Sequence, residues 1–129
     1  MTPPMSEFTP KGALSLAAIS VLGADGEYRD EELRRLQKLI QADEQAFFMA
    51  VQFYSERPTE ACIQVVAATL NDAQKRAALE MLIDIAQADG DMAAAEHELL
   101  RTYAVAFGVT PDTINTPPAK QSYDPSVFE

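Results

Sequence analysis

The sequence predicts an all-α protein, with about seven helices in one bundle-like domain and an internal pseudo-two-fold repeat of helix, Asp-Gly loop and helix. Apolar residues recur at helical spacing in several segments, and Pro, Gly and capping residues separate these segments. No segment alternates apolar and polar residues as a half-buried strand would. A chain of 129 residues fits one domain that can bury roughly two thirds of its unfolded surface.

The first two helices are marked by caps and by apolar faces. Residues 1–8 form an expected N-terminal arm, and Thr9-Pro10 places an N-cap before a first-turn proline. Gly23 ends this helix, and Asp30 is the expected N-cap of the next one. The inward residues are Leu14, Ala17, Ala18, Val21 and Leu22 in the first helix, and Leu33, Leu36 and Ile40 in the second.

Two apolar helices are expected in the middle of the chain. Residues 44–54 are apolar nearly all round, and residues 55–58 end that helix. Residues 59–70 contain β-branched residues that would suit a strand, but their length and alanine content favour a helix. We assign an aromatic cluster in the third helix to the core, with a partner-binding groove as the alternative; its members are Phe47, Phe48, Met49, Phe53 and Tyr54.

Three further helices complete the expected domain, residues 9–115. Asn71-Asp72 caps a long helix from about residue 73 to 88, whose broad apolar band makes it the expected central helix. Ala93 to Phe107 forms the next helix, with Gly108 as its stop. Thr110-Pro111-Asp112 predicts a short last helix. The tail, 116–129, contains three prolines and either docks through Tyr123 and Phe128 or stays loose.

The stretches GADGE, from residue 23, and QADGD, from residue 87, each follow an apolar helix and precede another helix. In this repeat Asp25 corresponds to Asp89, Glu32 to Glu96 and Leu36 to Leu100. A duplicated hairpin of this kind usually packs on its copy, which would bring both acidic corners to one end of the molecule. The spacing also matches the second half of an EF-hand loop, but apolar Val21 and Ile85 stand where that loop needs oxygen ligands.

Charge and cysteine content narrow the function. The chain has 20 acidic and 10 basic residues, a net charge of −10, which argues against nucleic-acid binding and membrane insertion and favours cations and basic proteins as partners. The start MTPPMSEFTP lacks the features of a signal peptide, so we expect a cytoplasmic protein. The single cysteine, Cys62, has apolar neighbours and is expected to be buried and inert.

The segments ADGEYRDEEL and IAQADGDMAAAEHELLRTYAVAFGVT resemble the tellurite-resistance TerB family over roughly residues 12–115. The carriers of the resemblance are the duplicated Ala-Asp-Gly-acid pattern and the small residue and glycine, Ala106 and Gly108, that close the later helix. The resemblance implies a cytoplasmic bacterial helical domain for resistance to tellurite and other stress. It also implies divalent-cation binding by the acidic loops and work alongside membrane-associated partner proteins. The second copy departs from the pattern, because Ala93, Ala94 and Ala95 stand where a polar N-cap is expected.

Two interpretations of the corners remain open. In the first, each Asp accepts backbone N–H groups of its own turn and the corners only cap helices, as in a structural interaction domain that could also self-associate. In the second, the corners bind Ca²⁺ or Mg²⁺, which take carboxylate and carbonyl oxygens. The candidate ligands are Asp25, Glu27, Glu32, Asp89, Asp91 and Glu96.

Other polar residues carry weaker signals. His97 is the only histidine, and without a second His or Cys nearby it makes a poor zinc site. Glu80 and Asp84 lie one turn apart, but no nucleophile or phosphate loop accompanies them, so a solvated helix face is expected. The sequence therefore predicts a protein that is not an enzyme.

Overall fold

The computed structural model describes residues 9–23, 30–41, 43–87, 94–109 and 128. For residues 84–87 it describes the backbone but not the side chains. These ranges contain helices and no strand, as the sequence predicts. The six helices are α1 (Pro10–Leu22), α2 (Asp30–Ile40), α3 (Glu44–Glu56), α4 (Thr59–Thr69), α5 (Asp72–Gln87) and α6 (Ala94–Ala106). The seventh helix, expected after Thr110, falls outside the described residues, and the internal repeat stays a prediction.

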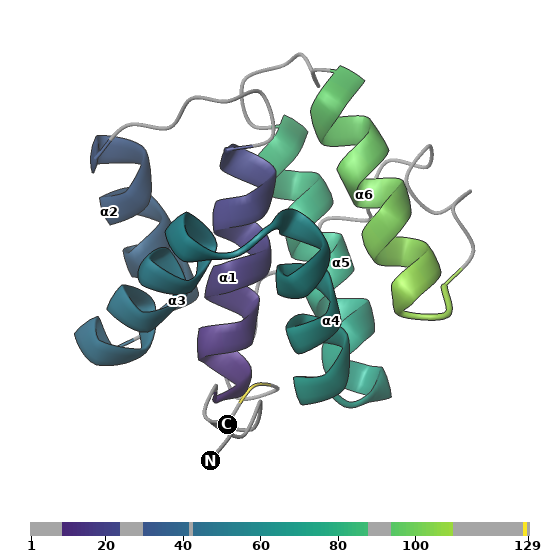
Figure 1. Cartoon of the computed structure of the whole chain (residues 1–129), viewed down its shortest axis with the longest axis horizontal. Coiled ribbons are helices and arrows are strands. Elements are labelled where there is room, and N and C mark those ends of the chain that lie inside the picture. Colours follow the sequence, from purple (N-terminus) through teal and green to yellow (C-terminus); the bar gives the residue numbers. More distant parts are fainter. Residues whose placement is uncertain (1–8, 24–29, 42, 88–93, 110–127, 129) are drawn as a thin grey trace.

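Helix α1 runs through the middle of the bundle and contacts each of the other five helices. Figure 1 shows α2 and α3 on one side of it and α4, α5 and α6 on the other. Every residue from Gly12 to Val21 is buried, although helical spacing alone predicts a single inward face. The expectation that the helix from about residue 73 to 88 is central is therefore wrong: Ala73, Arg76 and Glu80 on α5 are exposed.

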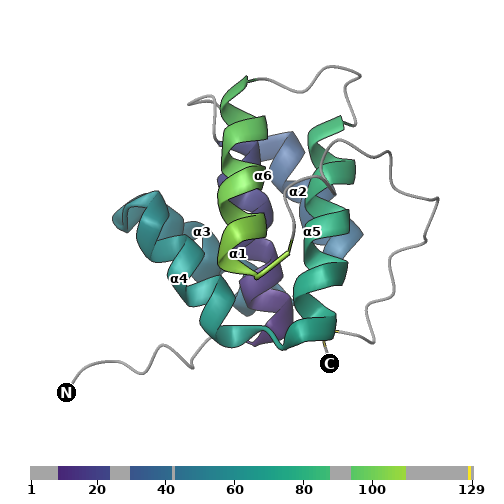
Figure 2. The same cartoon turned by 90° about the vertical axis from the view of Figure 1, so that its right-hand side faces the viewer.

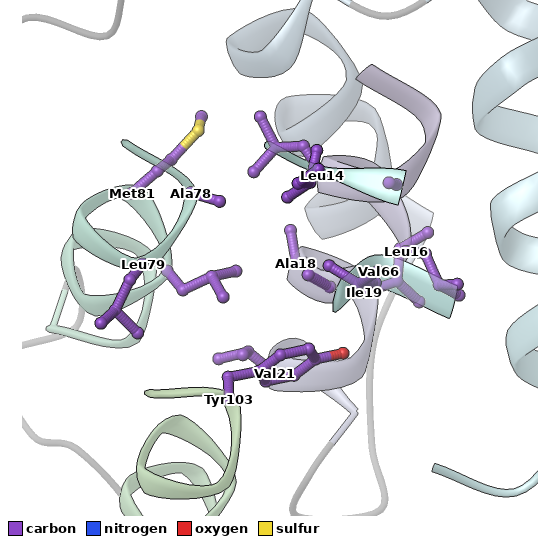
Figure 3. Packing of buried hydrophobic residues seen from close by; sticks show 14 of the residues in the cluster. Leu14, Leu16, Ala18, Ile19, Val21, Val66, Ala78, Leu79, Met81 and Tyr103 are labelled. Atoms are coloured by element: carbon purple, nitrogen blue, oxygen red, sulfur yellow. The ribbon is translucent and has the colours of Figure 1, made fainter. Parts of the chain in front are cut away.

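Small side chains explain why α1 can be covered on all sides. Glycine, alanine and serine alternate with larger apolar residues along PKGALSLAAISVL, so neighbouring helices can approach the backbone closely. Figure 3 shows Leu14, Ala18 and Ile19 of α1 between residues of α5 and Val66 of α4, with Tyr103 of α6 beside Val21. One continuous hydrophobic core results, and residues from all six helices contribute to it.

Local signals in the sequence account for most helix boundaries. The Thr9 hydroxyl accepts a hydrogen bond from the Gly12 amide at 3.0 Å, which confirms the predicted N-cap. Asn71 and Gln74 bond each other's backbone amides at 2.8 and 2.9 Å, a reciprocal cap before α5. Asp30, expected as an N-cap, instead lies inside the first turn of α2.

The aromatic residues of α3 divide between core and surface. Phe47 is buried and Phe53 and Tyr54 are half-buried, whereas Phe48 is 67% exposed. The assignment of Phe48 to the core is therefore wrong. Helix α3 packs on α1 and α4, so one side of it faces neighbours, and consecutive residues point about 100° apart around a helix.

The C-terminal tail contributes one residue to the core. Phe128 is only 1% exposed and belongs to the hydrophobic cluster, which confirms docking through this residue, while Tyr123 lies outside the described residues. In the described ranges, no helix has both the length and the apolar character needed to cross a membrane.

Candidate functional site

The acidic corners connect α1 to α2 and α5 to α6. Asp25, Glu27, Asp89 and Asp91 lie outside the described residues, so their positions stay predictions. The helix ends beside the corners are described. Figures 1 and 2 place the C-terminal ends of α1 and α5 and the N-terminal ends of α2 and α6 at the same end of the bundle. The two connections therefore begin and end close to one face of the molecule.

The other two candidate ligands, Glu32 and Glu96, occupy equivalent places on their helices. Each lies in the first turn, Glu32 in α2 and Glu96 in α6, and each is partly buried. Each also stands four residues before a buried leucine, Leu36 or Leu100. Residues four apart share one face of a helix. Both glutamates therefore lie on the side of their helix that faces the core. Both also lie at the N-terminal end of that helix, directly after an acidic corner.

Neighbouring acids on the same helices behave differently. Glu31 and Glu98 are exposed, while Glu32 and Glu96 are partly buried. The difference in exposure follows from helical phase, because adjacent residues point about 100° apart. In the described part of the chain no three Asp, Glu, His or Cys side chains come close enough to hold a metal ion. A complete cation site would thus need oxygens from the corners themselves, together with Glu32 and Glu96.

A buried polar cluster that was not predicted from the sequence lies near the C-terminal end of α1. The Tyr103 hydroxyl donates a hydrogen bond to Ser20 Oγ at 3.2 Å, and Ser20 Oγ donates one to the Leu16 carbonyl at 2.8 Å. Ser20 and Tyr103 are almost fully buried. The one hint in the sequence is Ser20 itself, because a serine is unusual at an inward position of an apolar helix.

Cys62 of α4 belongs to the same cluster. Burial raises the pKa of its thiol, and a hydrogen bond with Ser20 lowers it by less. Burial also raises the pKa of Tyr103, and its hydrogen bond with Ser20 lowers that pKa by less. The side chain of Cys62 is buried, as predicted, and a protonated thiol in apolar surroundings is chemically inert.

Comparison with known proteins gives the family. The family model of tellurite resistance protein TerB matches residues 12–116. The chain belongs to the TerB family. No curated protein and no solved structure matches it.

The TerB family is generally not catalytic. Glu80, one member of the acid pair considered above, is exposed, and the side chain of Asp84 is not described. His97 is partly buried and follows Glu96 in the first turn of α6.

Two shallow hollows lie on the described surface of this TerB domain. One, of about 530 Å³, lies between α2 and α3 and is lined by Gln37, Glu44, Gln45, Phe47, Phe48 and Val51. The other lies between the start of α5 and the end of α6, and Asp72, Arg76 and Glu80 contribute its charged side chains. The second hollow is at the opposite end of α5 from the α5–α6 corner, so it is separate from the candidate cation site.

Proposed function

We propose that this TerB domain is a non-enzymatic stress-response module of the cytoplasm that binds one divalent cation, Ca²⁺ or Mg²⁺, between its two acidic corners. The observation that supports it best is the matched placement of Glu32 and Glu96. Both are partly buried, and both precede a buried leucine by one turn. Both lie in the first turn of helices that start at the same end of the bundle.

The chemistry of the donors fits a hard cation. Six carboxylates are available in and beside the corners: Asp25, Glu27, Glu32, Asp89, Asp91 and Glu96. Ca²⁺ and Mg²⁺ prefer such oxygen ligands, supplemented by backbone carbonyls and water. In a chain of net charge −10, carboxylates brought together at one end of the bundle would repel each other, and a bound cation would remove that repulsion. The cation would therefore stabilise the fold by mass action.

Partner proteins form the second part of the proposal. A strongly acidic surface attracts basic protein surfaces and repels nucleic acid. The domain would thus work beside membrane-associated resistance proteins through contacts with their soluble, basic parts. Such binding would weaken as salt is added, because screening shortens the range of surface charges.

Calorimetric titration of the full chain with CaCl₂, MgCl₂ and ZnCl₂ tests the cation site. We expect Ca²⁺ or Mg²⁺ to release or absorb heat and to raise the melting temperature. At a free concentration of 100 times Kd the stabilisation is about 2.7 kcal/mol. No heat and no change in melting temperature at millimolar metal would refute cation binding.

Matched variants separate ligation from net charge. Glu32→Gln and Glu96→Gln remove one charge each from partly buried positions, whereas Glu31→Gln and Glu98→Gln remove the same charge from exposed positions. We expect at least a roughly tenfold rise in Kd for the first pair and under about a twofold change for the second, where only long-range charge is lost. Equal effects in both pairs would mean that the cations bind only diffusely to the acidic surface.

A scaffold without a ligand is the second candidate. Caps such as those of Thr9 and Asn71 show that polar side chains in this fold accept hydrogen bonds from the backbone amides at helix N-termini. In that case Asp25→Asn and Asp89→Asn would each cost about 1 kcal/mol of stability through lost turn bonds. They would leave metal response and partner binding unchanged. Sedimentation over a range of concentrations would show whether such a scaffold self-associates.

A further inference from the structure

The hollow between α2 and α3 is mostly apolar and has an exposed phenylalanine beside it. Phe47 and Val51 of α3 line it together with Gln37 of α2. Phe48 also lines the hollow, and this residue is 67% exposed. Single apolar residues are common on protein surfaces. Phe48 differs from these because it stands beside an open apolar hollow, and aromatic residues are enriched where proteins contact each other.

The two walls of the hollow carry opposite charge. On α2, the charged residues within one turn of Gln37 are all basic, namely Arg34, Arg35 and Lys38, and the acidic residues of this helix are confined to its first turn. Arg34 is exposed and precedes Gln37 by three residues, so it lies on the same face of α2. Helix α3 contains acidic residues and no basic ones, and its exposed Glu44 lines the hollow.

This distribution of charge selects the occupant of the hollow. A uniformly basic segment would meet Arg34, and a uniformly acidic one would meet Glu44, so either would face a like charge. A second copy of the chain avoids this conflict when a two-fold axis runs along the hollow. Its acidic wall then lies over the basic wall of the first copy, and its basic wall over the acidic one. In such a two-fold contact both chains use the same patch.

We propose that this chain forms a two-fold homodimer through the hollow between α2 and α3, in which Arg34 of each copy pairs with Glu44 of the other and the two Phe48 rings lie at the centre. The net charge of −10 on each copy opposes association. At about 0.15 M salt, however, the Debye length is about 8 Å, so distant charges are screened more than close pairs. The inference goes beyond the proposed function and uses no residue of the acidic corners.

Analytical ultracentrifugation of the full chain tests the dimer. The protein is examined from about 1 µM to about 1 mM, a range that covers weak and moderate affinities, in a buffer with EDTA so that the result is independent of any cation. We expect the mass to rise with concentration from one chain, 14.1 kDa, towards two chains. A mass of one chain throughout would refute the dimer and leave the hollow to a segment of a different protein. Growth beyond two chains would refute a closed two-fold contact.

Charge exchange tests the pairing between the copies. Arg34→Glu and Glu44→Arg each place like charges across the interface and should raise the dimer Kd at least about tenfold. An equimolar mixture of these two variants should dimerise again, because the introduced carboxylate of one chain meets the introduced guanidinium of the other. Arg35→Glu, on the opposite side of α2 from Gln37, and Glu60→Arg, in the first turn of α4, make the same charge changes at exposed positions away from the hollow. These controls should stay within about twofold of the unchanged chain, where only long-range charge is altered.

Truncation of Phe48 tests the centre of the interface. Phe48→Ala should raise the dimer Kd at least about tenfold, as loss of a central aromatic anchor does. Val105→Ala is the matched control, because Val105 of α6 is also 67% exposed, and its Kd should not change. Circular dichroism confirms that each variant is folded. A dimer that Phe48→Ala leaves unchanged, or a charge-exchanged mixture that stays monomeric, would place any self-association on another surface and refute the proposal.

Discussion

Gly23, the C-cap of α1, permits a close contact that no other residue would. Any residue can adopt its φ of −88°. Glycine is therefore needed here because it has no side chain, not because of its backbone conformation. A Cβ at this position would lie 2.9 Å from Tyr54 Cζ and 3.1 Å from Cε2, and would clash with the Tyr54 hydroxyl oxygen. Carbon atoms in good contact are about 3.5–4.0 Å apart, so Gly23→Ala must displace the tyrosine ring.

The expected cost follows from two opposing effects. Overpacking of this kind costs about 1–3 kcal/mol. Replacing glycine by alanine at a compatible φ restricts the unfolded chain and returns about 0.4–1 kcal/mol. The difference between the two ranges is about 0–2.6 kcal/mol, and the difference between their midpoints predicts that Gly23→Ala destabilises the protein by about 1.3 kcal/mol. In a Tyr54→Ala background the clash is absent, and the same substitution should become stabilising by about 0.4–1 kcal/mol.

Urea unfolding followed by far-ultraviolet circular dichroism measures this double-mutant cycle, with unchanged m-values as the check that the unfolded state is the same. Gly108→Ala is the control. Gly108 has φ +72° and open space around its missing side chain, so alanine there should cost about 1–2 kcal/mol of backbone strain, whatever residue stands at position 54. If Gly23→Ala is equally destabilising in both backgrounds, the close contact with Tyr54 is not the reason for the glycine.

Two further predictions concern the core. Phe128→Ala should cost about 3–5 kcal/mol of stability, because the residue is 1% exposed. Phe48→Ala should change stability by under about 0.5 kcal/mol, because the residue is 67% exposed. Similar losses of melting temperature in the two variants would contradict docking of the tail. Burial raises the pKa of Cys62 and Tyr103, so the folded protein holds these protons more tightly than the unfolded chain, and the free energy of unfolding should fall as pH rises above about 8.5 and further above about 10. Urea unfolding from pH 7 to 11 measures this fall, which should be smaller above pH 10 in Tyr103→Phe; an equal fall there would exclude Tyr103 as the source.

Only part of the candidate site could be predicted from the sequence. The duplicated acidic corners and the equivalence of Glu32 and Glu96 are visible as a pattern. Their exposure, and the contrast with Glu31 and Glu98, came from the tertiary structure. The Ser20–Tyr103 bond could not be predicted, because nothing in either local segment specifies a partner 83 residues away.

Most helices could be predicted from local residue patterns, because the signals that start and end a helix act over a few residues. Thr9, Asn71 and Gly108 cap or stop their helices as their residue types predict. The tertiary structure alone decided which helix is central, that Phe48 faces outward, and that Phe128 enters the core. Helical spacing shows which face of a helix is apolar, but burial also depends on how many neighbours cover that face. The number of neighbours is a property of the whole packed chain.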